Sequence, residues 1–276
     1  MTNKEKLGII AGEGKFPINI AKEANQKGVE VYVICAKNNA YEKDFAPYAK
    51  KTTTIKLGQM NSAIKFFKEN AVSKAVMAGR VQHVNIFSVM PDLRTAKVLA
   101  KIKDMCAETI LGAAVAEFKK EGIEFISSSS FMEKCLAQKG VLTKRAPSQE
   151  ENDSIELGLK ISKTMAGLDV GLTCVLCDRA VLALEAMEGT DNCIKRAGEI
   201  YASAPIGKGG SIVVVKVARP RQDDRYDLPV IGKGTIRAMK EAKAQVLAIE
   251  AQKTIILDIE EVIALADKYN ICITAI

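Results

Sequence analysis

The fold is decided by residues 7–34, LGIIAGEGKFPINIAKEANQKGVEVYVI. An aliphatic run from Leu7 to Ala11 leads into a glycine-containing turn. An amphipathic stretch follows from about Phe16 to Lys27, and then a second apolar run from Val29 to Ile34. This order of strand, helix and strand predicts a βαβ unit, whose two strands lie parallel in one sheet and are joined by a right-handed crossover.

The same rhythm continues through the first half of the chain. The pattern predicts a helix near 61–70, a strand at 74–78, helices at 93–103 and 108–120, and a strand at 123–126. We therefore expect residues 1–134 to form a Rossmann-like parallel-sheet domain.

A second domain is predicted after a less regular segment. Residues 135–153 contain Gly140, Pro147 and Ser148 between apolar stretches, which indicates a linker. Residues 154–276 then alternate strand and helix patterns, including a β-hairpin around Asp178 and a helix that begins near Gly189. The fold class expected for the whole chain is α/β: an N-terminal Rossmann-like parallel-sheet domain plus a C-terminal mixed α/β domain.

Composition and charge indicate a cytoplasmic globular protein. The 276 residues are 48% hydrophobic, no apolar run approaches the roughly 18 residues of a membrane span, and the N-terminus lacks the apolar core of a signal peptide. Seven scattered cysteines are typical of reduced thiols. The net charge of +7 fits attraction to phosphates or an anionic membrane surface, whereas the dispersed lysines argue against a nucleic-acid partner.

Two glycine and helix-start motifs suit phosphate. Gly12 and Gly14 follow the first strand, where glycine lets backbone amides approach a phosphate, but Pro17 stands where a dinucleotide fingerprint has its third glycine. In the second half, Thr190 or Asp191 caps a helix whose N-terminus would favour an anion. A ligand-free turn and a plain helix cap remain the alternatives.

The most polar segment is QDDRYDLPVIG, residues 222–232. Its three carboxylates could hold a divalent cation or activate water, and Arg225 offers a guanidinium group for phosphate. Asp227, beside Leu228 and Pro229, is the first choice for a metal ligand or water-orienting base, and Asp223 is the second. The alternative is a solvated surface turn.

Four segments together resemble one known family. They are GIIAGEGKFP at 8–17, MAGRV at 77–81, EAMEGTD at 185–191 and the 222–232 run. In order and spacing they are similar to the UDP-2,3-diacylglucosamine pyrophosphatases of the LpxI type, over nearly the whole chain. The resemblance implies hydrolysis of UDP-2,3-diacylglucosamine to UMP and lipid X in lipid A biosynthesis. It also implies dependence on Mg²⁺, with Mn²⁺ as an alternative, and a substrate lying between the two domains.

The resemblance and the residues together define a candidate site. Asp227 is the expected catalytic residue, and Asp227 and Asp223 are the expected metal ligands. The expected substrate-binding residues are Gly12, Gly14, Gly79, Arg80, Thr190, Asp191, Gln222 and Arg225. The expected partners are the diacyl substrate, the inner membrane surface in transient contact, and a second copy of the chain in a homodimer.

Two other functions stay open on the sequence. One is a nucleotide-sugar binding protein without catalysis, which would use the first domain alone and be indifferent to Asp227. The other is an NAD-dependent oxidoreductase, against which the missing third glycine argues.

Overall fold

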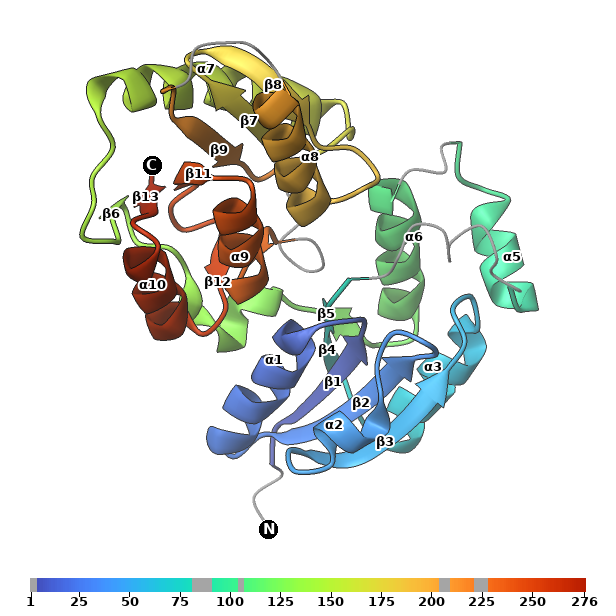
Figure 1. Cartoon of the computed structure of the whole chain (residues 1–276). Coiled ribbons are helices and arrows are strands. Elements are labelled where there is room, and N and C mark those ends of the chain that lie inside the picture. Colours follow the sequence, from blue (N-terminus) through green and yellow to red (C-terminus); the bar gives the residue numbers. More distant parts are fainter. Residues whose placement is uncertain (1–3, 81–90, 104–106, 204–208, 221–227) are drawn as a thin grey trace. The chain divides into compact units, whose positions relative to one another are not determined.

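The computed structural model describes residues 4–80, 91–103, 107–203, 209–220 and 228–276 (Figure 1). The chain forms two compact units that divide between Glu133 and Lys134. We call them the N-terminal and the C-terminal unit and describe each by itself.

The N-terminal unit is built on a parallel sheet of five strands in the order β3-β2-β1-β4-β5. The strands are β1 (Lys6–Ala11), β2 (Glu30–Ala36), β3 (Ala49–Ile55), β4 (Lys74–Ala78) and β5 (Glu124–Phe125). The helices are α1 (Lys15–Gln26), α2 (Glu42–Phe45), α3 (Met60–Glu69), α5 (Leu93–Leu99) and α6 (Ala107–Lys120). The predicted Rossmann-like parallel sheet is confirmed, and α1 is the expected crossover between β1 and β2.

Aromatic packing closes one face of this sheet. One buried cluster contains Phe66 and Phe67 of α3, Phe118 of α6 and Phe125 of β5. The rings of Phe118 and Phe125 meet edge to face, with their centroids 5.2 Å apart. Such pairs stabilise a core beyond the area that they bury, and here they fix α3 and α6 against the sheet.

The C-terminal unit is built on a mixed sheet of six strands in the order β6-β13-β11-β9-β7-β8. The strands are β6 (Gly140–Val141), β7 (Thr173–Cys177), β8 (Ala180–Leu184), β9 (Ile212–Lys216), β11 (Ala244–Ile249) and β13 (Cys272–Ala275). Strand β9 is parallel to β11 and antiparallel to β7. A separate parallel pair is formed by β10 (Val230–Ile231) and β12 (Ile255–Ile256). The predicted mixed α/β unit is confirmed.

Helices cover both faces of this sheet (Figure 1). Helix α7 (Gln149–Gly167) packs on one face, over the buried side chains of β7 and β9. The other face is covered by α8 (Thr190–Ser203), α9 (Lys233–Glu241) and α10 (Ile259–Lys268). Because β8, β9, β11 and β13 all run the same way, each of these three helices is a crossover between parallel strands.

Residues 135–153, expected as a linker, contain regular structure. Short 3₁₀ helices at Ser128–Phe131 and Glu133–Cys135 precede β6, which pairs with β13, and α7 begins at Gln149. A capping box starts α7: the Ser148 hydroxyl accepts the Glu151 N–H, and the Glu151 carboxylate accepts the Ser148 N–H at 2.8 Å. This segment is therefore part of the C-terminal unit.

None of the helices in the described ranges has the length and apolar character needed to cross a bilayer.

Candidate functional site

Several strand ends of the C-terminal sheet meet on one side. Strands β8, β9, β11 and β13 finish there, and β7 begins there, as the pairing of Thr173 with Lys216 and of Lys216 with Ile249 shows. Helix α8 starts on this side too, because it follows β8, and the first turn of α9 lies beside it, since Thr235 of α9 donates a hydrogen bond to Asp191 of α8. We call this side the site end of the C-terminal sheet. Ligands of α/β sheets bind beyond the carboxyl ends of strands in this way.

A buried polar relay lies at the site end. The Lys216 ammonium donates to the Thr190 hydroxyl at 2.7 Å, and that hydroxyl donates to Glu185 Oε1 at 3.0 Å. As whole residues, Lys216 and Glu185 are 5% and 9% exposed. We call these three side chains the Lys216 relay. It joins the last residue of β9, the first of α8 and the residue after β8.

Backbone contacts fix Glu185 in this position. Its N–H donates to the Thr173 carbonyl at 2.9 Å, which extends the ladder between β7 and β8 by one residue. The backbone at Gly171 lies so close that a Cβ there would be 2.0 Å from the Glu185 carbonyl oxygen. Only glycine fits at 171, and the Glu185 side chain is thereby held over the start of β7.

Helices α8 and α9 start side by side. Asp191, in the first turn of α8, accepts a hydrogen bond from the Thr235 hydroxyl of α9 at 3.0 Å. Farther along, Gly198 of α8 lies against Ala242, because a Cβ at 198 would be 2.6 Å from the Ala242 Cα. The two helices are therefore parallel, and their N-terminal dipoles add at the site end.

The predicted residues of the N-terminal unit form a second group. Glu13 and Arg80 exchange backbone hydrogen bonds of 2.8 and 2.9 Å, which ties the turn after β1 to the segment after β4. Gly12 and Gly79 cross within this bridge, where a Cβ on Gly79 would be 2.7 Å from the Gly12 carbonyl carbon. The structure thus brings Gly12, Gly79 and Arg80 together, and close backbone approach explains both glycines.

The start of α1 is the open part of this group. Gly14 is the N-cap of α1, has a φ of 106°, and makes no side-chain cap hydrogen bond. Nothing lies within 4 Å of the place where its Cβ would be. The turn is therefore open at the Cβ position of Gly14, and anion binding at the start of α1 stays a prediction.

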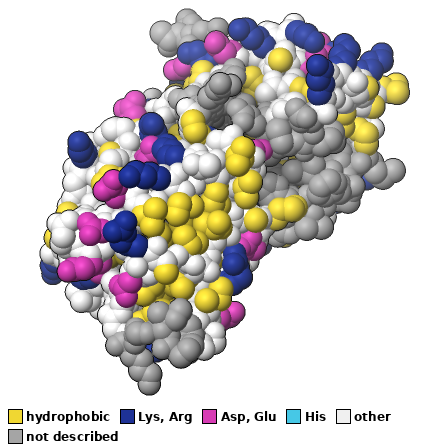
Figure 2. Space-filling model, turned by 90° about the horizontal axis from the view of Figure 1, so that it is seen from above, with side chains coloured by type: hydrophobic (Ala, Val, Ile, Leu, Met, Phe, Trp, Pro, Cys, Tyr) yellow, Lys and Arg dark blue, Asp and Glu magenta, His cyan; other side chains and the backbone are white. Residues whose placement is uncertain are grey.

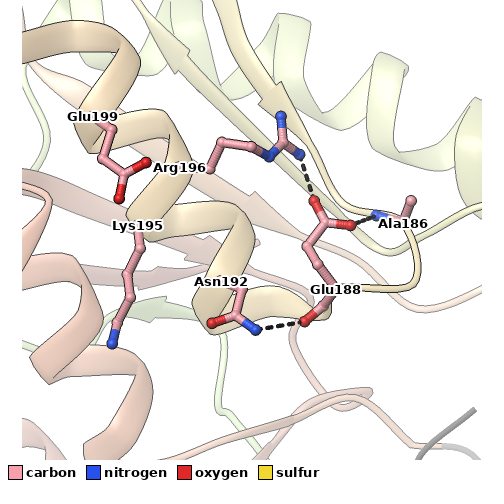
Figure 3. A pocket seen from close by; sticks show the side chains of 6 residues that line it. All are labelled: Ala186, Glu188, Asn192, Lys195, Arg196 and Glu199. Carbon is pink, nitrogen blue, oxygen red and sulfur yellow. Dashed lines mark hydrogen bonds and ion pairs between the residues drawn. The ribbon is translucent and has the colours of Figure 1, made fainter. Parts of the chain in front are cut away.

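A depression of about 600 Å³ lies beside α8 (Figure 3). Its lining residues are Ala186, Glu188, Asn192, Lys195, Arg196 and Glu199. Glu188 accepts hydrogen bonds from Arg196 and from the Ala186 N–H. Burial opposes ionisation, but these bonds prevail and lower the pKa of Glu188. The ion pair fixes the loop before α8, and none of the residues of the Lys216 relay lines this depression.

The acidic loop lies outside the described residues. This applies to Gln222, Asp223, Arg225 and Asp227. In the sequence, the loop comes between β9 and α9, the elements that carry Lys216 and Thr235 at the site end. Within the described parts of the chain, no cluster of three or more His, Cys, Asp or Glu side chains has the spacing of a metal site.

The cysteines are structural in the part of the chain that the structure describes. No disulfide joins the cysteines described there, which are Cys35, Cys135, Cys174, Cys177, Cys193 and Cys272. Cys174 and Cys177 belong to the hydrophobic clusters on opposite faces of the sheet, as their spacing in a strand predicts.

Sequence reasoning did not select Lys216 or Glu185 as site residues. Lys216 is the last residue of the aliphatic run IVVVK. A single charged residue in such a buried strand is the sequence signal that could have indicated a site residue. Glu185 begins the EAMEGTD segment, but only its contact with Thr190 gives it a place in the site.

The fold and these two groups define a class: a two-unit α/β protein with a glycine turn in one unit and paired helix N-termini beside a buried lysine in the other. Both features suit a phosphate-containing ligand. The chain belongs to the LpxI family, since the sequence model of the LpxI N-terminal domain matches residues 6–135 and that of the LpxI C-terminal domain matches residues 138–274.

The chain is similar to the UDP-2,3-diacylglucosamine pyrophosphatase LpxI of Caulobacter vibrioides. The two are 29% identical over 281 residues, which cover 98% of this chain and 97% of the relative. Among solved structures, phosphoribosylglycinamide synthetase from Anaerococcus prevotii and L-amino acid ligase from Bacillus licheniformis are 11% and 12% identical, both with a TM-score of 0.27. These alignments cover 70% and 68% of this chain but only 35% and 41% of those proteins, and the similarity is too low to carry an argument.

Proposed function

We propose that the protein hydrolyses the pyrophosphate bond of UDP-2,3-diacylglucosamine, giving UMP and 2,3-diacylglucosamine 1-phosphate (lipid X) in lipid A biosynthesis. The observation that carries this proposal is the match to both LpxI domains, together with the similarity over 98% of the chain to a relative with that activity in its name.

The chemistry needs positive potential at the phosphates and a water molecule in line with the bond that breaks. The adjacent N-termini of α8 and α9 supply part of that potential. Within the N-terminal unit, the N-terminus of α1 behind Gly14 is a separate position that would suit an anion. Asp227 orients the attacking water and accepts its proton.

Mg²⁺, or Mn²⁺ in its place, belongs to this proposal. Carboxylate oxygens are the ligands that Mg²⁺ prefers, and Asp227 and Asp223 would hold the ion. When bound, the ion would neutralise charge on the phosphoryl oxygens.

The test is direct. Purified protein is incubated with UDP-2,3-diacylglucosamine and Mg²⁺, and release of UMP is followed by chromatography. Hydrolysis in ¹⁸O-labelled water then identifies the attacked phosphorus by the product that gains the label. Binding without UMP release would instead favour the non-catalytic nucleotide-sugar binding protein. Full turnover in excess chelator, with negligible residual metal, would show that hydrolysis does not need Mg²⁺.

We also propose that the protein works in the cytoplasm with transient contact to the inner membrane, because its substrate carries two acyl chains. The net charge of +7 and exposed apolar residues on either side of the Gly171–Glu185 contact, Leu168 and Met187, favour an anionic bilayer. Cosedimentation with anionic vesicles, but not with neutral ones, is the expected result. Equal recovery with both vesicle types would argue against this contact.

A homodimer is the last part of the proposal. Strand β8 is an edge strand, and its Val181 and Leu184 are 43% and 39% exposed. Figure 2 shows hydrophobic side chains gathered on one face of the molecule, between charged ones. An exposed apolar edge favours pairing with a second copy. Sedimentation velocity should give a dimer that Val181→Lys dissociates, and a monomer at all concentrations would refute it.

A further inference from the structure

We propose that Lys216 binds a phosphoryl oxygen of the substrate's diphosphate, that Glu185 Oε2 accepts a hydrogen bond from a hydroxyl group of the same ligand, and that Thr190 is a positioning residue that holds the Lys216 ammonium group. The inference rests on the proposed function, because the diphosphate belongs to the substrate named there. It assigns the binding of that group to a residue outside the acidic loop and the glycine turn.

The first argument is the state of the Lys216 side chain. Lysine is almost never fully buried unless it is paired, yet Lys216 is 5% exposed at the end of β9. Within the described residues, the Thr190 hydroxyl is its one hydrogen-bond acceptor, and no carboxylate comes within 4.0 Å. An ammonium group has three donors. Two of them therefore lack an acceptor in the part of the chain that the structure describes.

A neighbouring lysine shows the contrast. Lys163 of α7 donates to Glu250 at 2.6 Å and to the Ala218 carbonyl at 2.9 Å. Its charge is compensated inside the protein, although it is more exposed than Lys216. Burial of an uncompensated charge is costly, so the spare donors of Lys216 indicate an anion that arrives from outside.

The second argument is the free oxygen of Glu185. Oε1 accepts from Thr190, while Oε2 is buried and has no hydrogen-bond partner among the described residues. Buried polar atoms without partners are rare in native proteins and call for an explanation. A ligand that carries acceptors for Lys216 and a donor for Glu185 Oε2 satisfies both groups. A sugar-linked diphosphate has both, in its phosphoryl oxygens and its hydroxyl groups.

The third argument is the position of the relay. Thr190 is the first residue of α8, a helix of 14 residues, and its neighbour Asp191 bonds to Thr235 in the first turn of α9. The Lys216 ammonium thus lies at the first turn of α8, whose N-terminus favours an anion, while the Asp191 carboxylate bonds to the first turn of α9. A purely structural relay between β8, β9 and α8 would explain the Thr190 contacts, but neither the spare lysine donors nor Glu185 Oε2.

Binding to the full-length protein tests the inference without turnover. Isothermal titration with UMP and with inorganic pyrophosphate compares the wild type with Lys216→Met and with Lys216→Met/Glu185→Gln. The double variant removes both buried charges together and so avoids an unpaired carboxylate. Lys160→Met is the matched control, since Lys160 forms an exposed pair with Glu156 on α7.

Lys216→Met should raise the Kd for both probes about ten- to a hundredfold, the loss expected for a hydrogen bond to a charged group. Thr190→Val should weaken binding and Thr190→Ser, which keeps the hydroxyl, should restore it. Wild-type Kd values in the folded double variant would overturn the inference, as would no binding of either probe to the wild type. If Lys216→Met alone does not fold, the Kd values of the double variant test the inference.

Turnover separates this inference from the proposed function. If the wild type releases no UMP from UDP-2,3-diacylglucosamine but binds the probes through Lys216, the hydrolysis is refuted and the inference stands. If Lys216→Met releases UMP with unchanged kcat and KM, the inference alone fails.

Discussion

Asp227 is the residue whose loss should cost the most turnover. Asp227→Ala is expected to lower kcat at least about a hundredfold, the usual loss for a positioned base or electrostatic group, while substrate still binds. Asp223→Ala should cost less, and Asp224→Ala least. The measurement is initial rate at saturating substrate and Mg²⁺. Near-normal turnover of Asp227→Ala would move the assignment to Asp223 or Glu188.

The crossing of Gly12 and Gly79 should tolerate no side chain. Gly79→Ala places a Cβ 2.7 Å from the Gly12 carbonyl carbon at a φ of 93°, so backbone strain and a clash act together. We expect a loss of about 3 kcal/mol in the free energy of unfolding. Gly14→Ala is the matched control for backbone strain without a clash, because φ 106° and ψ 179° lie in a region essentially restricted to glycine, and it should lose about 2 kcal/mol, less than Gly79→Ala. Equal losses in urea titrations would show that the crossing is loose.

At the level of elements, the start of α7 should depend on Glu151. This buried carboxylate accepts hydrogen bonds from Arg145, Ser211 and the Ser148 N–H. Burial opposes ionisation, but these hydrogen bonds prevail and lower the pKa of Glu151. A lowered carboxyl pKa stabilises the fold above the unfolded-state pKa of about 4.3, and this stabilisation is lost as the pH falls through the folded-state pKa.

Glu151→Gln should therefore destabilise the protein by about 2 kcal/mol at pH 7 and by less at pH 3.5. Urea unfolding at both pH values measures the difference. Glu260→Gln, at an exposed position in the first turn of α10, should change little at either pH. A difference between wild type and Glu151→Gln that stayed constant with pH would contradict the ionised hydrogen-bond network.

Elements whose hydrophobic residues follow one clear helix or strand periodicity could be predicted from the sequence. The βαβ start, the hairpin around Asp178 and helix α8 are found close to their expected bounds. Strand β3 was missed because AKKTTTI is polar and only partly buried at the edge of its sheet, and β13 because ICITA is a short run after a helix. Helix α5 ends at Leu99 rather than near 103.

The site was predictable only where one segment carries the whole signal. Thr190 and Asp191 could be selected because a helix start is a local pattern. Lys216 could not be selected, because its role depends on contacts with residues far away in the sequence. Thr190 and Glu185 come together with Lys216 only when β8 and β9 belong to one sheet. The carboxylates of the acidic loop remain predictions that mutation must test.

For the whole molecule, the thiols can report on each unit separately. Burial raises the pKa of Cys35, Cys174 and Cys193 to about 12, so these thiols should resist iodoacetamide at pH 8 in the native protein. Cys35 lies in the N-terminal unit and Cys174 in the C-terminal unit, and each unit has its own core. Mass spectrometry of labelled peptides should show Cys35 and Cys174 becoming reactive at different urea concentrations. Coincident transitions would show one cooperative unit.

The crossovers of the C-terminal sheet also set an order of events during refolding. Thr173, Glu185, Thr190, Lys216 and Thr235 come from five separate segments, so the site end exists only after three strands and two helices have joined. Contacts between distant segments form slowly, because loop closure costs entropy first. Recovery of UMP binding after dilution from urea should therefore lag behind recovery of helical circular dichroism. A protein that looks folded by spectroscopy can still be inactive, and ligand binding is the stricter criterion of a native preparation.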